Sequence, residues 1–348
     1  MSHGERGDGH EERGDGHEER GAGYEERGGE HGDLDGLSVD AAVDAVGDER
    51  VDPDRVRETL AIVASDGTVR RAAVDDALAN ASKVVTTAET RTELAGRKFA
   101  DVREDADPVL DLAPVSSRID DFAARLDAVE DRADALGDAV QEILARKEDG
   151  DLYRIARRIR RVTDAASETQ RAADDLQFEL DAFREWLADP DRRAAELADD
   201  VDAVADAVEA LDAVAEDIAT GGTDGADEAG RRWAAATIRH RVLSLMIADL
   251  RAELSALRAW ADREGVDPPS GVEPRIDDLA ARHDAVGERL ADRAAPAWVE
   301  RFDDRLTAVE EDLAEMEPPV VWSDVEAVVE EHRPDVGAGV EERRPDTT

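Results

Sequence analysis

The sequence predicts an all-α protein: an elongated rod of coiled-coil helices, with two three-helix bundles in series and disordered termini. Two observations carry this prediction. Apolar residues alternate at spacings of three and four over several stretches of about 30 residues, which is the heptad pattern of packed helices. Proline and glycine-rich segments fall between these stretches, where helices are expected to end.

With 348 residues, the chain is long enough for about two domains. We divide it at the expected helix breakers. The predicted segments are a disordered repeat at 1–36, a small helical unit at 37–81, a first long-helix bundle at 82–188, a second at 189–317, and a short helix with a polar tail at 318–348.

The first segment repeats seven residues, GDGHEER at 7–13 and 14–20 followed by GAGYEER at 21–27. Two glycines per repeat and almost no apolar residues leave little to offset the entropy of ordering, so we expect a disordered tail. His10 and His17 recur seven residues apart. We interpret this recurrence of histidine as low-complexity sequence drift, and weak metal binding by the two histidines is the alternative.

In the 37–81 unit, Ser38 is expected to cap a short helix. The pair Asp52-Pro53 marks the start of a second helix. Asp66-Gly67 predicts a turn, and a third helix is marked by Val69, Val74 and Leu78.

Long helices follow. Thr86 with Glu89 fits a capping box and predicts a helix that starts there and runs to about Glu104. Three heptad seams come next, and they cover Val115–Ile143, Leu152–Leu187 and Ala194–Ile218.

The pair Asp189-Pro190 stands between the second and third seams. Because the heptad phase continues across it, we favour one long kinked helix here, with a tight hairpin as the alternative. A glycine-rich loop is expected at 221–225.

The last part of the chain carries a seam from Ala236 to Ala261 and a final long helix. That helix is expected to kink near Pro296 and to end before Pro318-Pro319. Ser323 then caps a short helix that runs to about Glu331.

The charge is strongly acidic, since 44 basic and 88 acidic residues give 44 − 88 = −44. Lysine occurs only at Lys83, Lys98 and Lys147, so arginine supplies nearly all the positive charge. Lysine depletion with dispersed carboxylates is typical of proteins that stay soluble in molar salt, where screening is strong. We therefore expect a halophilic, cytoplasmic protein.

Several classes of protein are excluded at this stage. The absence of cysteine removes disulfides and thiol chemistry. No apolar run reaches the roughly 18 to 20 residues of a membrane span, and no signal peptide is expected. There is no phosphate-binding loop, nucleophile elbow or His-Glu-x-x-His motif, so we expect no enzyme, no cofactor and no metal site.

Histidine and tryptophan favour structural interpretations. His240 and His283 fall on seam positions of neighbouring helices, where setting the register is favoured over metal binding. Each tryptophan lies near a predicted helix end or kink, so we expect the indoles to close bundle ends, with ligand stacking as the alternative. The tryptophans are Trp186, Trp233, Trp260, Trp298 and Trp322.

One basic cluster stands out in the acidic chain. It consists of Arg154, Arg157, Arg158, Arg160 and Arg161, and the heptad phase directs all five away from the seam. One interpretation is ion pairing with aspartates of neighbouring helices, where each pair contributes little. The other is a docking face for an acidic protein or a phosphate-bearing ligand, since the guanidinium fork binds carboxylates bidentately.

Four stretches resemble a known family. They are ASKVVTTAETRTELA at 81–95, DLYRIARRIR at 151–160, QRAADDLQ at 170–177 and WLADP at 186–190. They are similar to the uncharacterised "halo transducer protein" family of salt-loving archaea, over roughly residues 35–320. The resemblance implies kinship with methyl-accepting chemotaxis transducers. This chain departs from those receptors, because it has no membrane span and no glycine-marked kinase-coupling tip.

The sequence favours a non-enzymatic cytoplasmic scaffold or adaptor that binds protein partners through coiled-coil surfaces, and homo-oligomerisation stays open. The first alternative is a soluble component linked to chemotaxis transducers. The second is a nucleoid-associated rod, which is disfavoured because the negative charge repels phosphate and molar salt weakens phosphate contacts.

Overall fold

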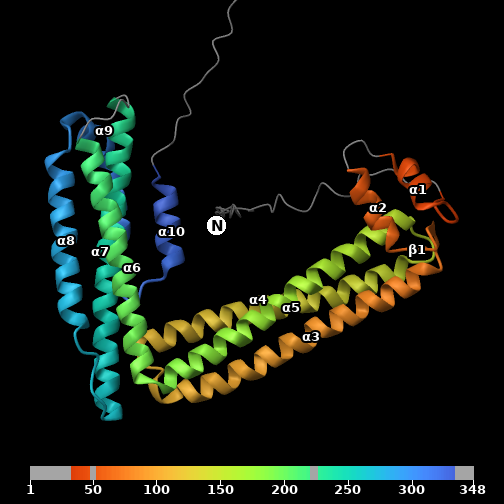
Figure 1. The fold of residues 1–348 in the computed structure, drawn as a ribbon, viewed down its shortest axis with the longest axis horizontal. Coiled ribbons are helices and arrows are strands. Elements are labelled where there is room, and N and C mark those ends of the chain that lie inside the picture. Colours follow the sequence, from red (N-terminus) through yellow and green to blue (C-terminus); the bar gives the residue numbers. More distant parts are fainter. Residues whose placement is uncertain (1–32, 48–51, 220–225, 334–348) are drawn as a thin grey trace, which may run out of the picture. The chain divides into compact units, whose positions relative to one another are not determined.

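The computed structural model describes residues 33–47, 52–219 and 226–333, and it is all-α with one small two-stranded sheet (Figure 1). In chain order the elements are α1 (Val39–Val46), α2 (Pro53–Ala61), β1 (Ala64–Ser65), β2 (Thr68–Val69), α3 (Ala73–Ala106), the 3-10 turn η1 (Asp107–Val109), α4 (Ala113–Arg146), α5 (Leu152–Ala188), α6 (Pro190–Ala219), α7 (Ala226–Glu264), α8 (Val272–Asp292), α9 (Pro296–Ala314) and α10 (Trp322–Glu331). The seven-residue repeat, the loop at 221–225 and the tail from 334 lie outside the described residues.

The chain forms two compact units. Unit 1 combines the chain up to Thr86 with residues 135–167, and unit 2 combines residues 87–134 with the chain from Glu168 onward. The predicted segments were drawn at helix breakers, whereas these units follow packing. Each unit therefore combines parts of more than one predicted segment.

In unit 1, both predicted helix starts are confirmed. The Ser38 hydroxyl accepts a hydrogen bond from the Ala41 N–H at 3.2 Å, and the Asp52 carboxylate accepts one from the Asp54 N–H at 2.9 Å. These contacts satisfy N–H groups that the first turn of a helix leaves without an intrahelical partner.

The Asp66-Gly67 turn was predicted, but the β-hairpin that contains it was not. It closes a β-hairpin of β1 and β2, in which Asp66 (φ 49°) and Gly67 (φ 73°) both adopt left-handed backbone. That geometry matches the twist of two antiparallel strands. The expectation that Val69 belongs to a helix was therefore wrong, since Val69 is buried in β2.

The predicted helix start at Thr86 was also wrong. Helix α3 runs without interruption from Ala73 to Ala106, so Thr86 and Glu89 lie in its interior. The capping-box pattern starts a helix only where the preceding residues cannot be helical. No proline or glycine precedes Thr86 in α3, and the helix continues through the motif.

The three heptad seams are confirmed as buried helix faces. Nearly all the apolar side chains of each seam are buried, from Val115 to Ile143 in α4, from Leu152 to Leu187 in α5 and from Leu197 to Ile218 in α6. Helix α4 ends at Arg146 and α5 begins at Leu152, which confirms the predicted break at Glu148–Asp151.

The preference for one kinked helix through Pro190 was wrong, and so was the hairpin alternative. Helix α5 ends at Ala188, and α6 begins at Pro190 and packs on α7 and α8. The one residue between them, Asp189, accepts hydrogen bonds from the N–H groups of Asp191 (3.0 Å) and Arg192 (3.3 Å). Proline disfavours helical backbone at the preceding residue, and the Asp189 side chain caps the next helix.

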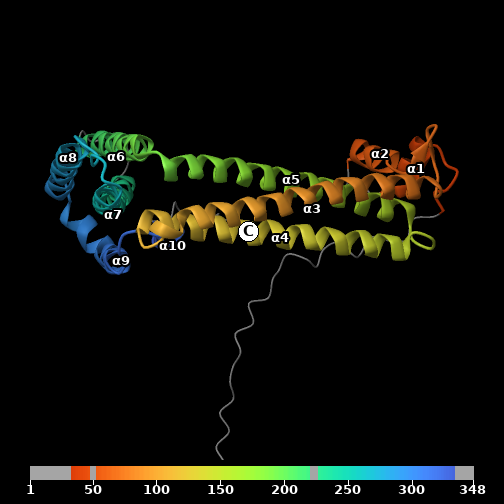
Figure 2. The same cartoon turned by 90° about the horizontal axis from the view of Figure 1, so that it is seen from below.

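Within unit 2, helices α6 to α9 form a bundle in which α7 lies next to α6, α8 and α9 (Figure 2). Helix α8 is antiparallel to α7. Near one end of the pair the Trp233 indole donates to the Leu290 carbonyl at 3.0 Å, and near the other end Arg258 pairs with Glu273 at 2.7 Å.

The kink predicted near Pro296 is a chain reversal. Helix α9 runs parallel to α7, because the Trp298 ring lies 6.3 Å from the Trp233 ring and Glu310 pairs with Arg241 at 2.9 Å, further along both helices. It is therefore antiparallel to α8. Pro296 occupies the first turn of α9, where its missing N–H costs no helical hydrogen bond.

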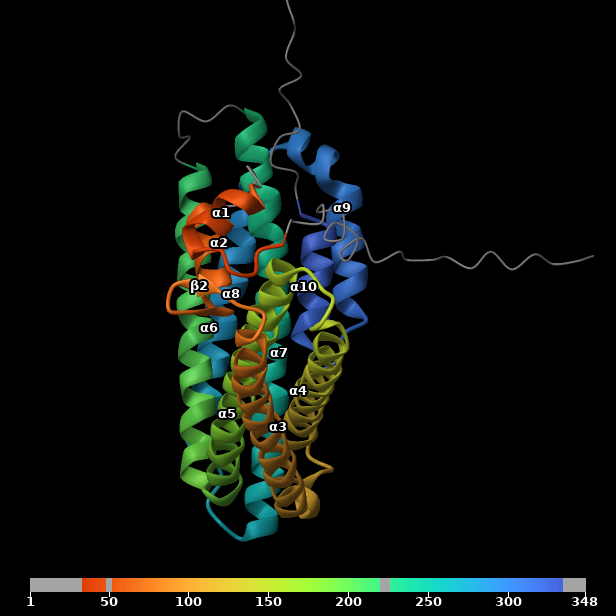
Figure 3. The ribbon, with the colours of Figure 1, turned by 90° about the vertical axis from the view of Figure 1, so that its right-hand side faces the viewer.

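Helix α10 lies beside α9 (Figure 3). It begins at Trp322, one residue before the predicted cap, and ends at Glu331 as predicted. Its buried side chain is that of Val325.

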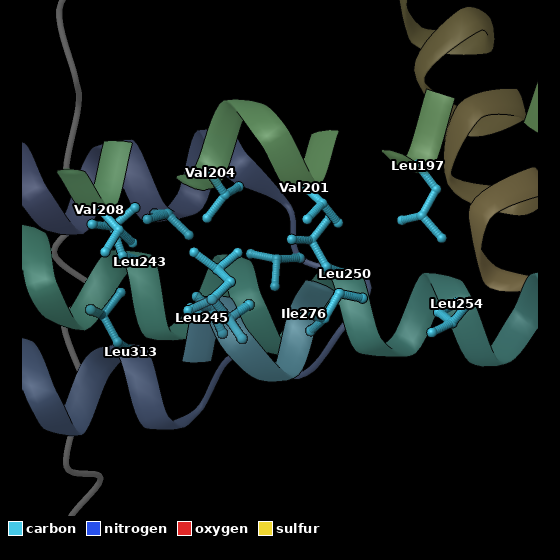
Figure 4. Close-up of a cluster of buried hydrophobic side chains, with 14 of the residues drawn as sticks. Leu197, Val201, Val204, Val208, Leu243, Leu245, Leu250, Leu254, Ile276 and Leu313 are labelled. Atoms are coloured by element: carbon cyan, nitrogen blue, oxygen red, sulfur yellow. The ribbon is translucent and has the colours of Figure 1, made fainter. Parts of the chain in front are cut away.

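The centre of unit 2 is an apolar core contributed by α6, α7, α8 and α9 (Figure 4). Each fully buried leucine or isoleucine of this kind contributes about 1.5 to 3 kcal/mol relative to an exposed one. The side chains labelled there are Leu197, Val201, Val204, Val208, Leu243, Leu245, Leu250, Leu254, Ile276 and Leu313.

Candidate functional site

A cleft of about 440 Å³ lies in unit 2 where four segments meet. Its walls come from the first turns of α4, from the middle of α6, from the Met246–Glu253 stretch of α7 and from Pro318–Trp322. The lining is mixed: apolar side chains and three prolines stand beside three carboxylates and one arginine. A concave, mostly apolar surface with a few convergent charged groups is typical of a binding site.

The segment after α9 closes one side of the cleft. Pro318 and Pro319 cannot continue the helix, so the chain leaves α9 and passes over α7. Two contacts hold it there: the Val320 N–H donates to the Asp249 carboxylate at 3.3 Å, and the Trp322 side chain also hydrogen-bonds to Asp249. Asp249 is thus the residue of α7 that anchors this wall.

Arg118 of α4 brings the positive charge. Its guanidinium lies 4.1 Å from the centre of the Trp186 ring and donates a hydrogen bond to Glu196 of α6 at 2.6 Å. The Glu253 carboxylate is 4.0 Å away, at the limit of an ion pair. Arg118 is therefore committed to Trp186 and Glu196 and only partly compensates Glu253.

Glu253 has the strongest electrostatic perturbation in the cleft. Its side chain is 21 % exposed, and burial raises its pKa to about 7. Arg118 opposes this rise in pKa, whereas the negative charges of Asp200, Glu196 and Asp249 add to it. Close to neutral pH, Glu253 therefore exists as a mixture of protonated and ionised forms.

Two further carboxyls in the cleft are perturbed in the same direction. Burial raises the pKa of Asp249, and the hydrogen bonds from Val320 and Trp322 offset part of that rise. Asp200, on the exposed side, has its pKa raised by partial desolvation and by the charge of Glu196. Among the described residues, no cation forms an ion pair with Asp200 or Asp249. The cleft is therefore suited to accept positive charge from outside.

The predicted arginine cluster lies elsewhere, on α5 in unit 1. Arg160 donates to Glu58 at 3.0 Å and to the Thr59 hydroxyl at 3.2 Å, both on α2. Arg158 lies 3.9 Å from Glu142 of α4. Arg154, Arg157 and Arg161 also take part in interactions. For Arg158 and Arg160 these contacts support the ion-pairing interpretation, and docking at the cluster stays a prediction.

His240 and His283 meet across α7 and α8. Their rings stack with centres 3.8 Å apart and an interplanar angle of 13°. Each Nε2 atom is hydrogen-bonded to the backbone carbonyl of the other histidine, at 3.1 and 2.9 Å. Gly287 makes room for this arrangement, because a Cβ there would lie 2.6 Å from the His240 Nε2 atom. Both Nε2 atoms are thus used in joining the helices, and the described residues contain no group of three metal-ligating side chains.

The burial of His240 predicts that the protein loses stability below about pH 6.5. Burial, followed by the neighbouring His283, lowers the pKa of His240, while Asp284 raises it and Arg241 lowers it. The folded state therefore binds this proton more weakly than the unfolded state, and stability falls as the pH drops below the ordinary value, by up to about 1.4 kcal/mol per pH unit. Denaturant unfolding at pH 7.5 and 5.5 measures the effect.

The control for this prediction is His240→Gln, which keeps a donor for the His283 carbonyl but does not titrate. The raised carboxyl pKa values in the cleft act in the opposite direction, so the comparison with this variant isolates the histidine. An identical pH dependence in both proteins would contradict the prediction.

The cleft itself was not predicted from the sequence. Pro318-Pro319 and Trp322 were interpreted only as a helix end, and Glu253 resembles any other acidic residue on a helix surface. The positions of the tryptophans give the clearest signal, since Trp186 supports Arg118 and Trp322 lines the cleft. Trp186, Trp233 and Trp260 are buried, whereas Trp298 and Trp322 are half-buried.

No protein-family model, curated protein or solved structure matches the chain. Within the described residues, no helix combines the length and the apolar character that crossing a membrane requires.

Proposed function

We propose that this chain is a non-enzymatic scaffold or adaptor of a salt-rich cytoplasm, and that the cleft of unit 2 is where a partner protein docks. The observation that carries this proposal is the composition of the cleft. Apolar walls surround Asp200 and Asp249, which form no ion pair with any described cation, and Glu253, which Arg118 only partly compensates. The surface therefore offers both burial and charge complementarity to a partner.

The surroundings of the cleft support a protein partner. Val321 lies between two lining residues, Val320 and Trp322, and is 60 % exposed. A large exposed apolar side chain beside a cleft extends the contact surface beyond the volume that a small ligand fills. Specific protein interfaces combine an apolar centre with a polar rim, as this surface does.

The test is a pull-down with the full-length chain in 3 M KCl, followed by a binding measurement with each purified partner. We expect Val321→Asp to weaken binding by about 10-fold or more, since it places a charge in the apolar part of the interface. The matched control is Val266→Asp, an exposed valine of the α7–α8 connection that is 38 % exposed. Equal binding by both variants would contradict the proposal.

A second arm tests the arginine cluster. If the cluster is a docking face, changing Arg157 and Arg160 together to Ser leaves helicity intact but removes a bound partner protein. If this double variant loses a partner that Val321→Asp retains, the docking site is on α5 instead of the cleft. If it retains every partner, the cluster is structural.

A further inference from the structure

Unit 2 already contains two guanidinium groups bound in the same way. Arg193 is buried, lies 3.7 Å from the centre of the Trp260 ring, and donates to the Leu187 carbonyl and to Glu264. Arg118 lies over Trp186 and donates to Glu196. In both cases an indole supplies a face and a carboxylate supplies the charge-assisted hydrogen bond.

The cleft presents a third set of these groups, and the one arginine among its described lining residues, Arg118, is already bound to Trp186 and Glu196. Trp322 supplies an indole, and Asp249 and Glu253 supply carboxylates. The two acids are four residues apart on α7, so their side chains lie on the same face of the helix, one turn from each other. Asp200 of α6 adds a third carboxylate to the lining.

The lining favours a guanidinium over an ammonium ion. Met246, Pro318 and Pro319 offer apolar surface for an alkyl stem. A guanidinium is weakly hydrated, stacks on aromatic rings and presents a planar fork to carboxylates, whereas an ammonium is a strongly hydrated point charge. In molar salt the screening length is about 3 Å, so contact geometry decides binding more than long-range attraction.

We infer that the cleft binds the guanidinium group of an arginine side chain from the partner, between Trp322 and the carboxylates of Asp249 and Glu253. The inference rests on the proposed function for the source of that side chain. The cleft is then an arginine-recognition site, and a partner supplies the cation that the chain provides for itself at Trp186 and Trp260.

This recognition is linked to pH. An incoming cation favours the ionised form of Glu253, whose pKa is raised to about 7, so binding releases a proton near neutrality. The charged groups that face Glu253 are Arg118 on α4, Glu196 and Asp200 on α6, and Asp249 on its own helix. Because the ionised fraction of Glu253 rises from about 0.1 at pH 6 to about 0.9 at pH 8, affinity for the cation rises by up to about ninefold over that range.

The experiment titrates the full-length chain in 3 M KCl with N-acetyl-arginine N-methylamide. The neutral isostere N-acetyl-citrulline N-methylamide and the corresponding lysine compound serve as matched probes. The readout is the indole N–H resonance of Trp322 in a ¹H–¹⁵N spectrum, assigned by its loss in Trp322→Phe. We expect saturable binding of the arginine compound, binding at least about tenfold weaker for citrulline, and tighter arginine binding at pH 8 than at pH 6.

Variants complete the test. Glu253→Gln should weaken binding of the arginine compound by about tenfold and remove the pH dependence. Glu209→Gln, an exposed glutamate of α6 outside the cleft, should leave binding unchanged. Circular dichroism and the thermal midpoint of each variant confirm that the fold is intact.

The outcomes separate the two proposals. Equal binding of arginine and citrulline compounds, or of arginine and lysine compounds, overturns guanidinium recognition. Absence of arginine binding in a chain whose partner is still lost on Val321→Asp overturns this inference alone. Arginine binding in a chain that captures no partner through the cleft supports the recognition site and overturns the adaptor function.

Discussion

Lowering the salt concentration from 3 M to 0.05 M KCl is expected to lower the thermal midpoint of the protein sharply and to loosen its helix packing. The chain has 88 acidic and 44 basic residues, so even complete pairing leaves 88 − 44 = 44 acids without a cation. The screening length grows from about 3 Å at 1 M salt to about 30 Å at 0.01 M, which restores repulsion between neighbouring carboxylates.

The magnitude follows from the helix surfaces. A like-charged pair one turn apart on a helix costs about 0.2 to 0.5 kcal/mol when it is unscreened. Helix α6 alone carries several exposed acids, among them Asp199, Asp206 and Glu209, while Asp202 between them pairs with Arg275. Summed over the long helices, this repulsion rivals a typical net stability of about 5 to 15 kcal/mol.

The measurement is thermal unfolding followed by circular dichroism across a KCl series, with recovery of the signal when salt is restored. As a control, the double variant Asp206→Asn with Glu209→Gln should flatten the salt dependence, because it removes two exposed acids without touching the core. Equal midpoints of the wild-type chain in 0.05 M and 3 M KCl would rule out this account of the acidic surface.

Local periodicity was sufficient to predict the helices but not their connections. The seam of α4 from Val115 to Ile143 could be predicted, because a helix with one buried face requires an apolar residue at every turn along that face. The reversal between α8 and α9 could not, because the heptad phase on either side of Pro296 carries no information about whether the chain continues or turns back.

The candidate site was even less accessible to sequence reasoning. Glu253 and Asp249 are two among 88 acids, and their perturbed pKa values arise from the approach of α4, α6 and Pro318–Trp322. Those approaches are tertiary contacts between residues that are distant in sequence. The β-hairpin at Asp66-Gly67 is a different case. The Asp-Gly pair is visible in the sequence, but it was interpreted as a turn between two helices.

Arg193→Ala is expected to destabilise the protein by about 2 to 5 kcal/mol, because it leaves a cavity beside the Trp260 ring and removes the donor to the Leu187 carbonyl and the cation that pairs with Glu264. Arg193 is 3 % exposed and follows the break between α5 and α6. Its guanidinium donates to the Leu187 carbonyl at 2.7 Å, pairs with Glu264 of α7 and covers the Trp260 ring. One side chain therefore ties the end of α5 to the start of α6 and to the end of α7.

The neighbouring residue provides a matched control. Arg192 pairs with Glu185, but its side chain is 41 % exposed, so Arg192→Ala should cost less than about 1 kcal/mol. Arg193→Lys should fall between the two, because it keeps the charge and loses the planar fork that reaches a carbonyl and a carboxylate together.

Denaturant unfolding in 3 M KCl measures all three variants. A double-mutant cycle with Glu264→Gln then separates the ion pair from the contacts with Leu187 and Trp260. If Arg193→Ala costs no more than Arg192→Ala, the junction at Asp189 is held by the capping contacts of Asp189 and not by the buried guanidinium. A large loss confined to Arg193 would establish that a buried arginine fixes the change of chain direction that proline alone permits.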